Sequence, residues 1–316
     1  MRIIITYLVV FFMVMALMAS SDGRDSLLTT VIISVIYLLA CEALRKPGSN
    51  NKTMTLMGGV NVLESRDLCM EVGEKFKSIS DDLKINYIFK GSFDKANRSS
   101  IDSFRGPGLD EGLKILDEIS KEFDIPTITD IHEPEQAKPV GEVCEIIQVP
   151  AFLARQTDLV IAAAKTGNIL QFKKPQFLSA PEMKNIIKKC ESAGNSKITL
   201  CERGSSFGYN NLVVDTLNFQ ILKNLNKPVI FDVTHSLQLP GGQGNSAGGR
   251  REYLFSLAKA GLSQGIAGLF LEAHPDPDKA KCDGPCALKL EMLEPFLVQL
   301  KELDDFIKNQ DALEIS

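Results

Sequence analysis

The chain has 316 residues, of which 44% are hydrophobic and 24% charged, with a net charge of −5 and a pI near 5.4. This length suits one large domain, since α/β barrels commonly reach about 250 residues. The acidic balance argues against nucleic acid as a partner, so any binding of anions must depend on a local group of cations.

The N-terminal residues 1–52 differ in composition from the rest of the chain. Two uncharged runs, 3–19 and 27–41, lie near or below the length that spans a membrane. Three interpretations stay open: a signal peptide, a membrane hairpin with both ends in the cytoplasm, or an upstream start that is not used. In the third case translation begins near Met54 or Met57.

A polar stretch, 46–53, joins this segment to the rest of the chain and is predicted to be a linker. We therefore divide the chain into an apolar extension, residues 1–52, and a main domain, residues 53–316. Contact with a membrane is expected only if the extension is translated, and the main domain is expected in the cytoplasm.

From residue 55 onward, short apolar runs alternate with amphipathic stretches. Eight runs are predicted to be strands: 55–61, 86–92, 126–132, 145–150, 169–174, 197–203, 228–235 and 266–274. Helical periodicity marks 108–123, 212–225 and 288–307. Eight strand–helix units predict a (β/α)8 TIM barrel better than a doubly wound sheet. No GxGxxG motif follows a strand, which argues against a dinucleotide-binding fold.

Most of the predicted strands end in polar residues. These residues are Asn61, Lys90, Asp130, His132, Lys174, Arg203, His235, Glu272 and His274. Because the C-terminal ends of barrel strands surround the active site, we expect these side chains to meet at one mouth. Any single one could instead be an ordinary solvent-facing strand end. Together with Lys95 and Arg98 on the loop after the second strand, the cations favour a phosphate or carboxylate ligand.

Three further features leave alternatives open. The glycine-rich loop 238–251 precedes a helix start and suits either an anion site or a mobile lid. Lys90 and Lys174 could form a Schiff base or could simply hold an anion. Cys282 and Cys286 have the spacing of half a zinc site, but no second pair accompanies them. We interpret them as two unconnected thiols.

Several long motifs resemble one enzyme family. They are NVLESRD (61–67), FKGSFDKANRSS (89–100), TDIHEP (129–134), KKPQF (173–177), ERGSSFGYNNLVVD (202–215), FDVTHSLQ (231–238) and EAHPDPDKAKCDGP (272–285). The chain resembles the 3-deoxy-D-manno-octulosonate 8-phosphate synthases, also called 2-dehydro-3-deoxyphosphooctonate aldolases. The resemblance implies a barrel, usually a homotetramer, that joins phosphoenolpyruvate to D-arabinose 5-phosphate and water and releases phosphate. The product serves lipopolysaccharide synthesis, and no cofactor or lysine Schiff base is implied.

The resemblance also implies roles for individual residues. The implied catalytic residues are Asn61, Lys95, His235 and Asp283. The implied substrate-binding residues are Lys90, Asn97, Arg98, Ser99, Asp130, Lys174, Arg203, Gln238 and Glu272. Lys174 and Arg203 would hold the phosphate of phosphoenolpyruvate, with Lys90 and Lys95 near its carboxylate and reacting carbon. Asn97, Arg98 and Ser99 would receive arabinose 5-phosphate.

Members of this family differ in their use of a metal. The metal-using form has a cysteine at the end of the first strand, which completes a set with a His, a Glu and an Asp. Here Asn61 stands at that position, while His235, Glu272 and Asp283 remain. Loss of the thiolate weakens binding of a transition metal, so we predict no metal and expect Asn61 to orient a water or a substrate group.

Two alternative functions are weighed against this prediction. One is a related phosphoenolpyruvate-dependent synthase of the heptulosonate 7-phosphate or sialic acid type, against which the KANRSS motif argues. The other is a membrane-tethered barrel without catalysis, against which the complete set of mouth residues argues.

Overall fold

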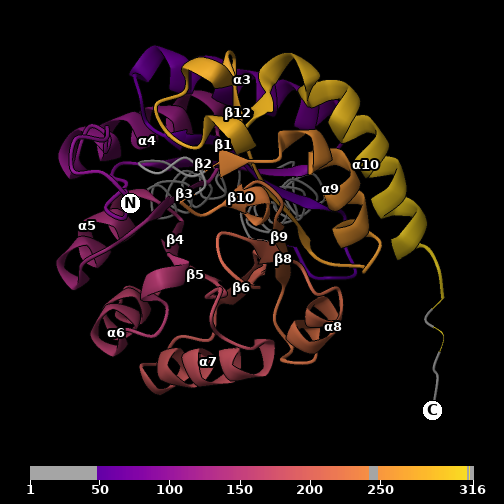
Figure 1. The fold of residues 1–316 in the computed structure, drawn as a ribbon. Coiled ribbons are helices and arrows are strands. Elements are labelled where there is room, and N and C mark those ends of the chain that lie inside the picture. Colours follow the sequence, from indigo (N-terminus) through magenta and orange to yellow (C-terminus); the bar gives the residue numbers. More distant parts are fainter. Residues whose placement is uncertain (1–47, 242–247, 312, 314–316) are drawn as a thin grey trace, which may run out of the picture. The chain divides into compact units, whose positions relative to one another are not determined.

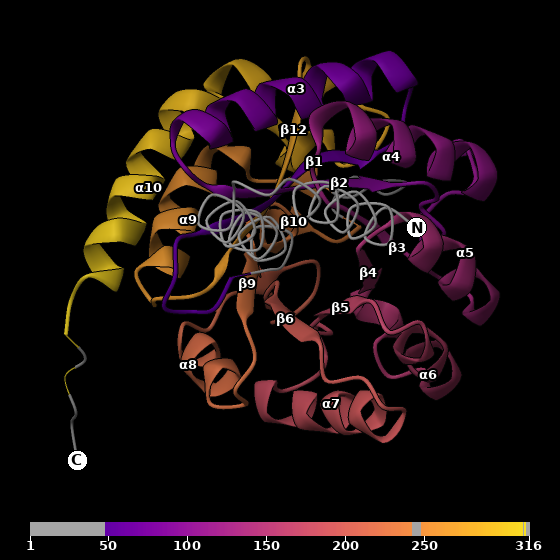
Figure 2. The ribbon, with the colours of Figure 1, turned by 180° about the vertical axis from the view of Figure 1, so that it is seen from behind.

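The computed structural model describes residues 48–241, 248–311 and 313, which form a closed barrel ringed by helices (Figures 1 and 2). The expectations for residues 1–47 lie outside these residues. Within the described ranges, no helix is long and apolar enough to cross a bilayer.

Eight parallel strands build the barrel wall. They are β1 (Thr55–Val62), β2 (Asn86–Ser92), β3 (Thr127–Asp130), β4 (Ile146–Val149), β5 (Ile169–Lys173), β6 (Ile198–Glu202), β9 (Val229–Asp232) and β12 (Gly268–His274). Each pairs with the next in this order, and β1 also pairs with β12, which closes the barrel. Each strand lies within or overlaps one predicted run, so the (β/α)8 prediction is confirmed.

Helices cover the outside of the barrel (Figure 1). They are α3 (Arg66–Asp82), α4 (Leu109–Phe123), α5 (Ala137–Val143), α6 (Thr157–Lys165), α7 (Met183–Ser192), α8 (Leu217–Lys223), α9 (Leu254–Leu262) and α10 (Leu293–Lys308). Their apolar faces pack on outward-facing strand side chains; α4, for example, buries Leu113, Leu116 and Ile119. This outer layer is the larger of the two cores.

A smaller core fills the barrel interior. Its buried members are Met57, Ile88, Ile128, Ile146, Cys201, Ile230, Ala267 and Phe270. All but Ala267, which directly precedes β12, come from the strands, and such layers of apolar side chains usually fill the interior of this fold. Polar side chains nearer the C-terminal ends of the strands therefore lie above an apolar floor.

The predicted helix 212–225 begins later than expected. Leu212–Val213 form β8, which pairs antiparallel with β7 (Ser205–Ser206), and the helix α8 starts at Leu217. The apolar residue Leu212 is buried, but it lies in this hairpin and not on a helix face. Leu212 fits the helical spacing of apolar residues in 212–225, but it belongs to a strand, so that spacing predicted the start of the helix wrongly.

Two other junctions are also extended and not helical. Leu288–Lys289 form β13 beside β12, so α10 begins after the predicted start of its helix. Gly248–Gly249 form β11, which pairs with β10 (Gln238–Leu239) before the chain reaches α9. In each case a neighbouring extended segment supplies backbone hydrogen bonds that a helix start could not make.

The end of the predicted linker is bound to the barrel. The Asn50 side chain donates to the Lys227 carbonyl at 3.1 Å and accepts from the Val229 N–H at 2.9 Å. The Met54 N–H, which is fully buried, donates to Asp304 Oδ2 at 3.0 Å. These bonds join the start of β1 to the start of β9 and to α10.

Candidate active site

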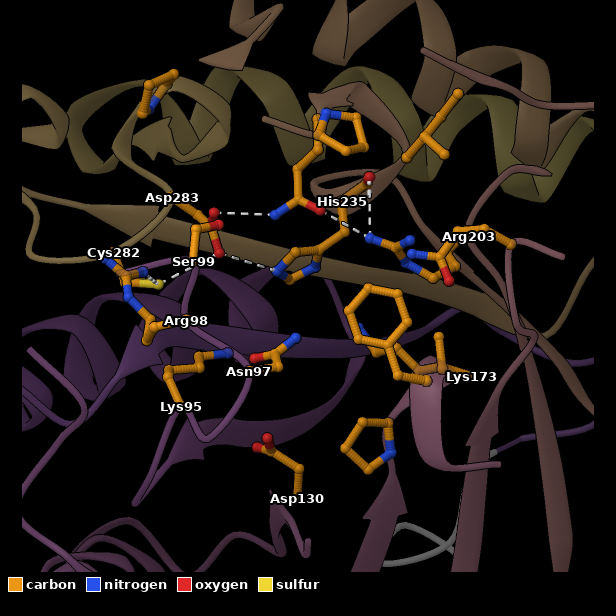
Figure 3. A pocket seen from close by; sticks show the side chains of 18 of the residues that line it. Lys95, Asn97, Arg98, Ser99, Asp130, Lys173, Arg203, His235, Cys282 and Asp283 are labelled. Carbon is orange, nitrogen blue, oxygen red and sulfur yellow. Dashed lines mark hydrogen bonds and ion pairs between the residues drawn. The ribbon is translucent and has the colours of Figure 1, made fainter. Parts of the chain in front are cut away.

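A cavity of about 620 Å³ opens at the C-terminal ends of the strands (Figure 3). The predicted site residues that line it are Lys90, Lys95, Asn97, Arg98, Ser99, Asp130, Arg203, His235, Gln238 and Asp283. They come from strand ends and loops distributed around the barrel. The structure thus brings most of the predicted residues to one mouth.

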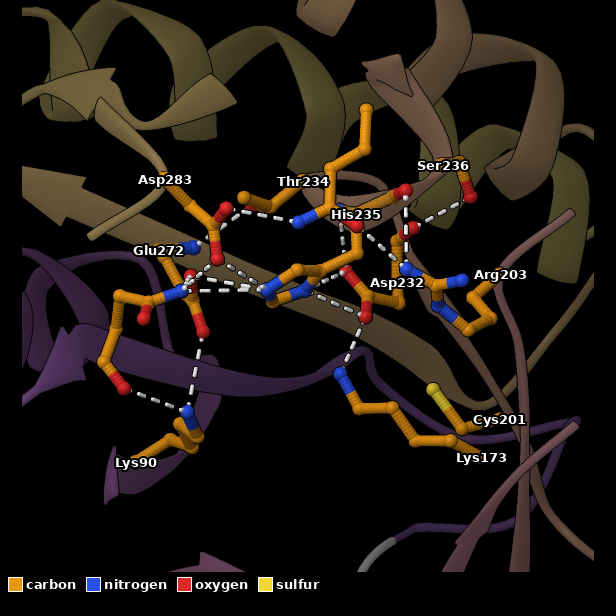
Figure 4. Close-up of polar contacts among 12 residues, drawn as sticks. Lys90, Lys173, Cys201, Arg203, Asp232, Thr234, His235, Ser236, Glu272 and Asp283 are labelled. Carbon is orange, nitrogen blue, oxygen red and sulfur yellow. Dashed lines mark hydrogen bonds and ion pairs between the residues drawn. The ribbon is translucent and has the colours of Figure 1, made fainter. Parts of the chain in front are cut away.

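Asn61 and Glu272 do not line the cavity, but they belong to a polar cluster that includes the lining residues His235 and Asp283. Figure 4 shows Glu272, His235 and Asp283 close together. The Asn61 amide nitrogen lies 3.2 Å from His235 Nε2 and 3.0 Å from Asp283 Oδ2, and it donates to Glu272 at 2.5 Å. Glu272 also accepts from Lys90 at 3.1 Å. One amide nitrogen therefore joins three ionisable side chains from three parts of the chain.

This arrangement does not fit a transition metal. The nitrogen toward which His235, Glu272 and Asp283 converge is an amide donor, which offers no lone pair to a cation. Among the residues that the structure describes, no group of three or more His, Cys, Asp or Glu side chains is arranged to hold a metal ion. The Asn61 Oδ1 is buried without a protein partner in that part of the chain, and it can accept a hydrogen bond from water or a substrate.

Two buried lysines with opposite pKa shifts stand at the β2 side of the mouth. Burial lowers the pKa of Lys90 to about 8, and the nearby Lys95 cation acts in the same direction against Glu272. Burial also opposes the charge on Lys95, but Asp130 and Glu272 outweigh it and raise the Lys95 pKa. Asp130 is itself buried, yet Lys95 and His132 hold its pKa well below the ordinary value. Lys95 is therefore a fixed cation, whereas Lys90 can lose its charge in mildly alkaline solution.

Of the two consecutive lysines at the end of β5, Lys173, the last residue of the strand, lines the cavity, and Lys174 does not. The Lys174 amine donates to the Gly204 carbonyl and to Ser205 Oγ, both at 3.1 Å, and lies 3.6 Å from Glu202. Lys174 and Glu202 are both fully buried. The expectation that Lys174 lines the mouth is therefore wrong, because that side chain is turned toward Glu202 and the segments that follow β5 and β6.

Lys173 belongs to a buried chain of charges that the sequence did not reveal (Figure 4). Its amine contacts Asp232, and it lies over the Phe270 ring, 3.4 Å from the centroid. Asp232 also accepts from the Nδ1 of His235, at 2.8 Å. Burial alone would lower the His235 pKa, but Asp232 and Glu272 raise it above the ordinary value. Burial opposes the charge of Asp232 too, yet His235 and Lys173 hold its pKa far below the ordinary value.

Arg203 and Asp283 are linked through Gln238. Arg203 donates to Gln238 Oε1 at 2.8 Å, and the Gln238 amide donates to Asp283 Oδ1 at 2.9 Å. The other terminal nitrogen of Arg203, Nη1, is buried and makes no hydrogen bond within the described chain. Burial opposes the charge of Asp283, but a hydrogen bond and the positive charge of His235 keep its pKa far below the ordinary value. The cluster thus offers one free guanidinium donor beside a fixed carboxylate.

Arg98 closes the other side of the cavity. Its guanidinium contacts the Cys282 thiol and donates to the Lys281 carbonyl at 3.3 Å (Figure 3). The thiol of Cys286 lies apart from this contact, 3.9 Å from the carbonyl of Gly248, and both cysteines are free. This agrees with the interpretation of two unconnected thiols.

His274, an expected member of the mouth, and Gly249, in the glycine-rich loop, both have other surroundings. The Nε2 of His274 lies 3.7 Å from Glu64, its Nδ1 accepts from the Asp276 N–H at 3.0 Å, and it does not line the cavity. At Gly249 a Cβ atom would lie 2.5 Å from the Cys286 Sγ. That glycine therefore permits the packing of two loops, which accounts for it without a bound anion.

Comparison with known proteins agrees with this geometry. Residues 44–309 match the model of the DAHP synthetase I family. The chain is 64% identical over 266 residues to "2-dehydro-3-deoxyphosphooctonate aldolase 1" of Pseudomonas putida, covering 84% of this chain and 95% of that protein. Over the same shares it is 65% identical to the 2-dehydro-3-deoxyphosphooctonate aldolase of Stutzerimonas stutzeri and 64% identical to that of Ectopseudomonas mendocina. With its barrel and its polar mouth, the chain belongs to the DAHP synthetase I family.

Proposed function

We propose that the chain is a transferase that condenses phosphoenolpyruvate with D-arabinose 5-phosphate and water, giving 3-deoxy-D-manno-octulosonate 8-phosphate and inorganic phosphate. The observation that carries the proposal is the single mouth that gathers five cations: Lys90, Lys95, Arg98, Lys173 and Arg203. Two anionic substrates must be held together there, and such a concentration of buried cations suits that task. The relatives' names agree with this reaction.

The two anions are assigned to opposite sides of the mouth. Lys173 and the free Nη1 of Arg203 suit the phosphate of phosphoenolpyruvate, since both residues are buried and line the same cavity. Lys90 and Lys95 suit its carboxylate and reacting carbon. Arg98, together with Asn97 and Ser99, would receive the phosphate of the sugar.

The reaction can then proceed without a covalent link to the protein. Carbon 3 of phosphoenolpyruvate attacks the sugar aldehyde, forms a C–C bond and leaves positive charge at carbon 2. The aldehyde C=O π bond breaks and its oxygen takes up a proton to become a hydroxyl. Water adds at carbon 2 and loses one proton, and the new carbon 2 hydroxyl then loses its own proton as the C–O bond to phosphate breaks, which leaves a ketone and inorganic phosphate. His235 and Asp283 are the proposed proton acceptors for this water, and the unpartnered Asn61 Oδ1, beside His235, would orient it. Positioned acids and bases typically contribute ~10²–10⁴-fold to rate.

We also propose that the reaction needs no metal. The donor set around the Asn61 amide supports this, because a transition metal would have to displace an amide that already binds three side chains. Charge stabilisation at the reacting centre would come from the lysines and His235.

The assembly is proposed to be a homotetramer in the cytoplasm that serves lipopolysaccharide synthesis. Exposed aromatic side chains near the mouth support self-association: Phe152, Phe177, Phe207 and Tyr209 are 53%, 61%, 72% and 97% exposed in the single chain. The free thiols support a reducing compartment. Light scattering of the purified chain would measure the assembly.

Phosphate release by the full chain tests the proposed reaction. We expect turnover with phosphoenolpyruvate and arabinose 5-phosphate, and much lower turnover when erythrose 4-phosphate replaces the sugar. A preference for erythrose 4-phosphate would identify a heptulosonate-type enzyme. Absence of turnover with both sugars would favour a barrel without catalysis.

A further inference from the structure

Asp232 is a buried carboxylate with three donors and no contact with the cavity. It ends β9 and is fully buried. Its Oδ1 accepts from the His235 main-chain N–H at 2.9 Å, and its Oδ2 contacts both the Lys173 amine and, at 2.8 Å, the His235 ring Nδ1. The carboxylate therefore joins a cation of the mouth to the imidazole near the reacting centre.

The chemistry of these contacts fixes the state of the ring. An ionised carboxylate only accepts hydrogen bonds, so the His235 Nδ1 must carry a proton to make its bond. The other ring nitrogen, Nε2, then faces Asn61, Glu272 and Asp283 at 3.2, 3.4 and 3.7 Å. Of the two ring nitrogens, Nε2 is the one that faces the mouth. By holding a proton on Nδ1, Asp232 leaves Nε2 as the ring nitrogen that can accept a proton from water.

The same carboxylate anchors Lys173. A lysine side chain has four flexible bonds, and Lys173 is held between the Phe270 face and Asp232. The cation–π contact with the Phe270 ring attracts the amine but does not fix its position, whereas the hydrogen bond to the Asp232 carboxylate does. Without Asp232, the amine loses its only charged partner among the described contacts.

We propose that Asp232 is a positioning residue that fixes the His235 tautomer and the Lys173 amine together, so that proton handling and phosphate binding keep one geometry. This inference rests on the proposed function, because it assigns His235 and Lys173 to that reaction. Asp232 acts through these two side chains and touches no substrate.

The variant Asp232→Asn tests the proposal. In this variant, the single acceptor oxygen of the asparagine amide can accept from the His235 main-chain N–H. The NH₂ group of the amide then faces two other donors, the His235 ring Nδ1–H and the Lys173 amine, and can bind neither. We expect kcat to fall by at least ~10²-fold, as positioned acid–base groups contribute that much, and KM for phosphoenolpyruvate to rise about tenfold. KM for arabinose 5-phosphate should stay within about twofold, since Arg98 lies away from Asp232.

Asp304→Asn is the matched control. Asp304 is equally buried and pairs with Lys308 at 2.6 Å, but it lies at the closed end of the barrel. It should lose stability with kcat nearly unchanged. An Asp232→Asn enzyme that keeps kcat within twofold of the native value, or loses no more kcat than Asp304→Asn, overturns the proposal.

A second measurement needs no variant of Asp232. The chain has three histidines, so ring ¹⁵N signals can be assigned with His132→Gln and His274→Gln. A proton on His235 Nδ1 of the native protein supports the proposal, and a bare Nδ1 contradicts it. If the native protein shows this proton but no phosphate release, the proposed function fails while the positioning geometry stands.

Discussion

Replacing Lys173 and Lys174 separately should give opposite phenotypes, although the two residues are adjacent. Lys173→Met removes a donor from the cavity, and a charged hydrogen bond is worth about 1.5–3 kcal/mol. We expect KM for phosphoenolpyruvate to rise about 10- to 100-fold. Asp232 keeps His235 as a partner, which limits the loss of stability.

Lys174→Met should instead destabilise the fold. Its amine lies 3.6 Å from Glu202 and has three carbonyls and a hydroxyl within 3.1–3.5 Å, which compete for its three N–H donors. Removing it leaves the Glu202 carboxylate buried without its cation, and breaking a buried pair costs about 3–5 kcal/mol. In a chain of this size that corresponds to a fall in Tm of roughly 10 °C. The kcat of the protein that remains folded should be close to native.

The pH dependence of this loss has a definite sign. Burial already raises the Glu202 pKa above its ordinary value of 4.5, and loss of Lys174 raises it further. The variant is therefore most stable below the unfolded pKa, and stability falls as pH rises through the folded pKa. Adding Glu202→Gln should restore much of the Tm at pH 8.

Thermal unfolding and steady-state phosphate release, measured on both variants, test which lysine binds substrate and which one stabilises the fold. A Lys174→Met enzyme with native Tm and a large increase in KM for phosphoenolpyruvate would refute the reasoning. So would a Lys173→Met enzyme with native kinetics.

Three further predictions concern the mouth itself. In the native enzyme, kcat/KM for phosphoenolpyruvate should fall as pH rises through a pKa of about 8, because Lys90 must be cationic to bind the carboxylate. Lys90→Arg should move this alkaline fall beyond pH 10. A native profile that stays flat to pH 10 would contradict the role given to Lys90. Arg98→Ala should mainly raise KM for arabinose 5-phosphate, whereas Lys95→Ala should mainly lower kcat; equal effects on the two substrates would disprove a divided site. The native enzyme should keep its activity in chelator, whereas Asn61→Cys should gain stimulation by a divalent metal; inactivation of the native enzyme by chelator, reversed by metal, would show that a metal is used.

The sequence predicted the barrel well because strand and helix periods differ clearly, but it misplaced one lysine. In β5 the apolar Leu170 and Phe172 face the outer core, and Ile169 faces the interior. Strict alternation from Ile169 directs Lys173 inward and Lys174 outward. The alternation was therefore visible in the sequence. The predicted strand, however, extended to residue 174, which put its polar end at Lys174 in place of Lys173.

The role of Asp232 could not be predicted in the same way. The run 228–235 was interpreted as one strand, in which Asp232 and His235 would point to opposite faces. The strand ends at Asp232, and a short 3-10 turn at His235–Leu237 folds the imidazole back over the carboxylate. The turn that brings the imidazole over the carboxylate depends on hydrogen bonds to Asp232. The alternation of apolar and polar residues along the sequence does not show these bonds.

The buried start of β1 determines where the chain can be shortened. If translation or a designed fragment began at Met54, a free ammonium group would replace the N–H that now donates to Asp304. That group would stand at a position that is fully buried in the longer chain, and the Asn50 bonds to Lys227 and Val229 would be lost. A charge added at a buried position is costly even beside a carboxylate. A fragment designed to carry the barrel should therefore keep the residues from Pro47 onward, with which the compact unit begins.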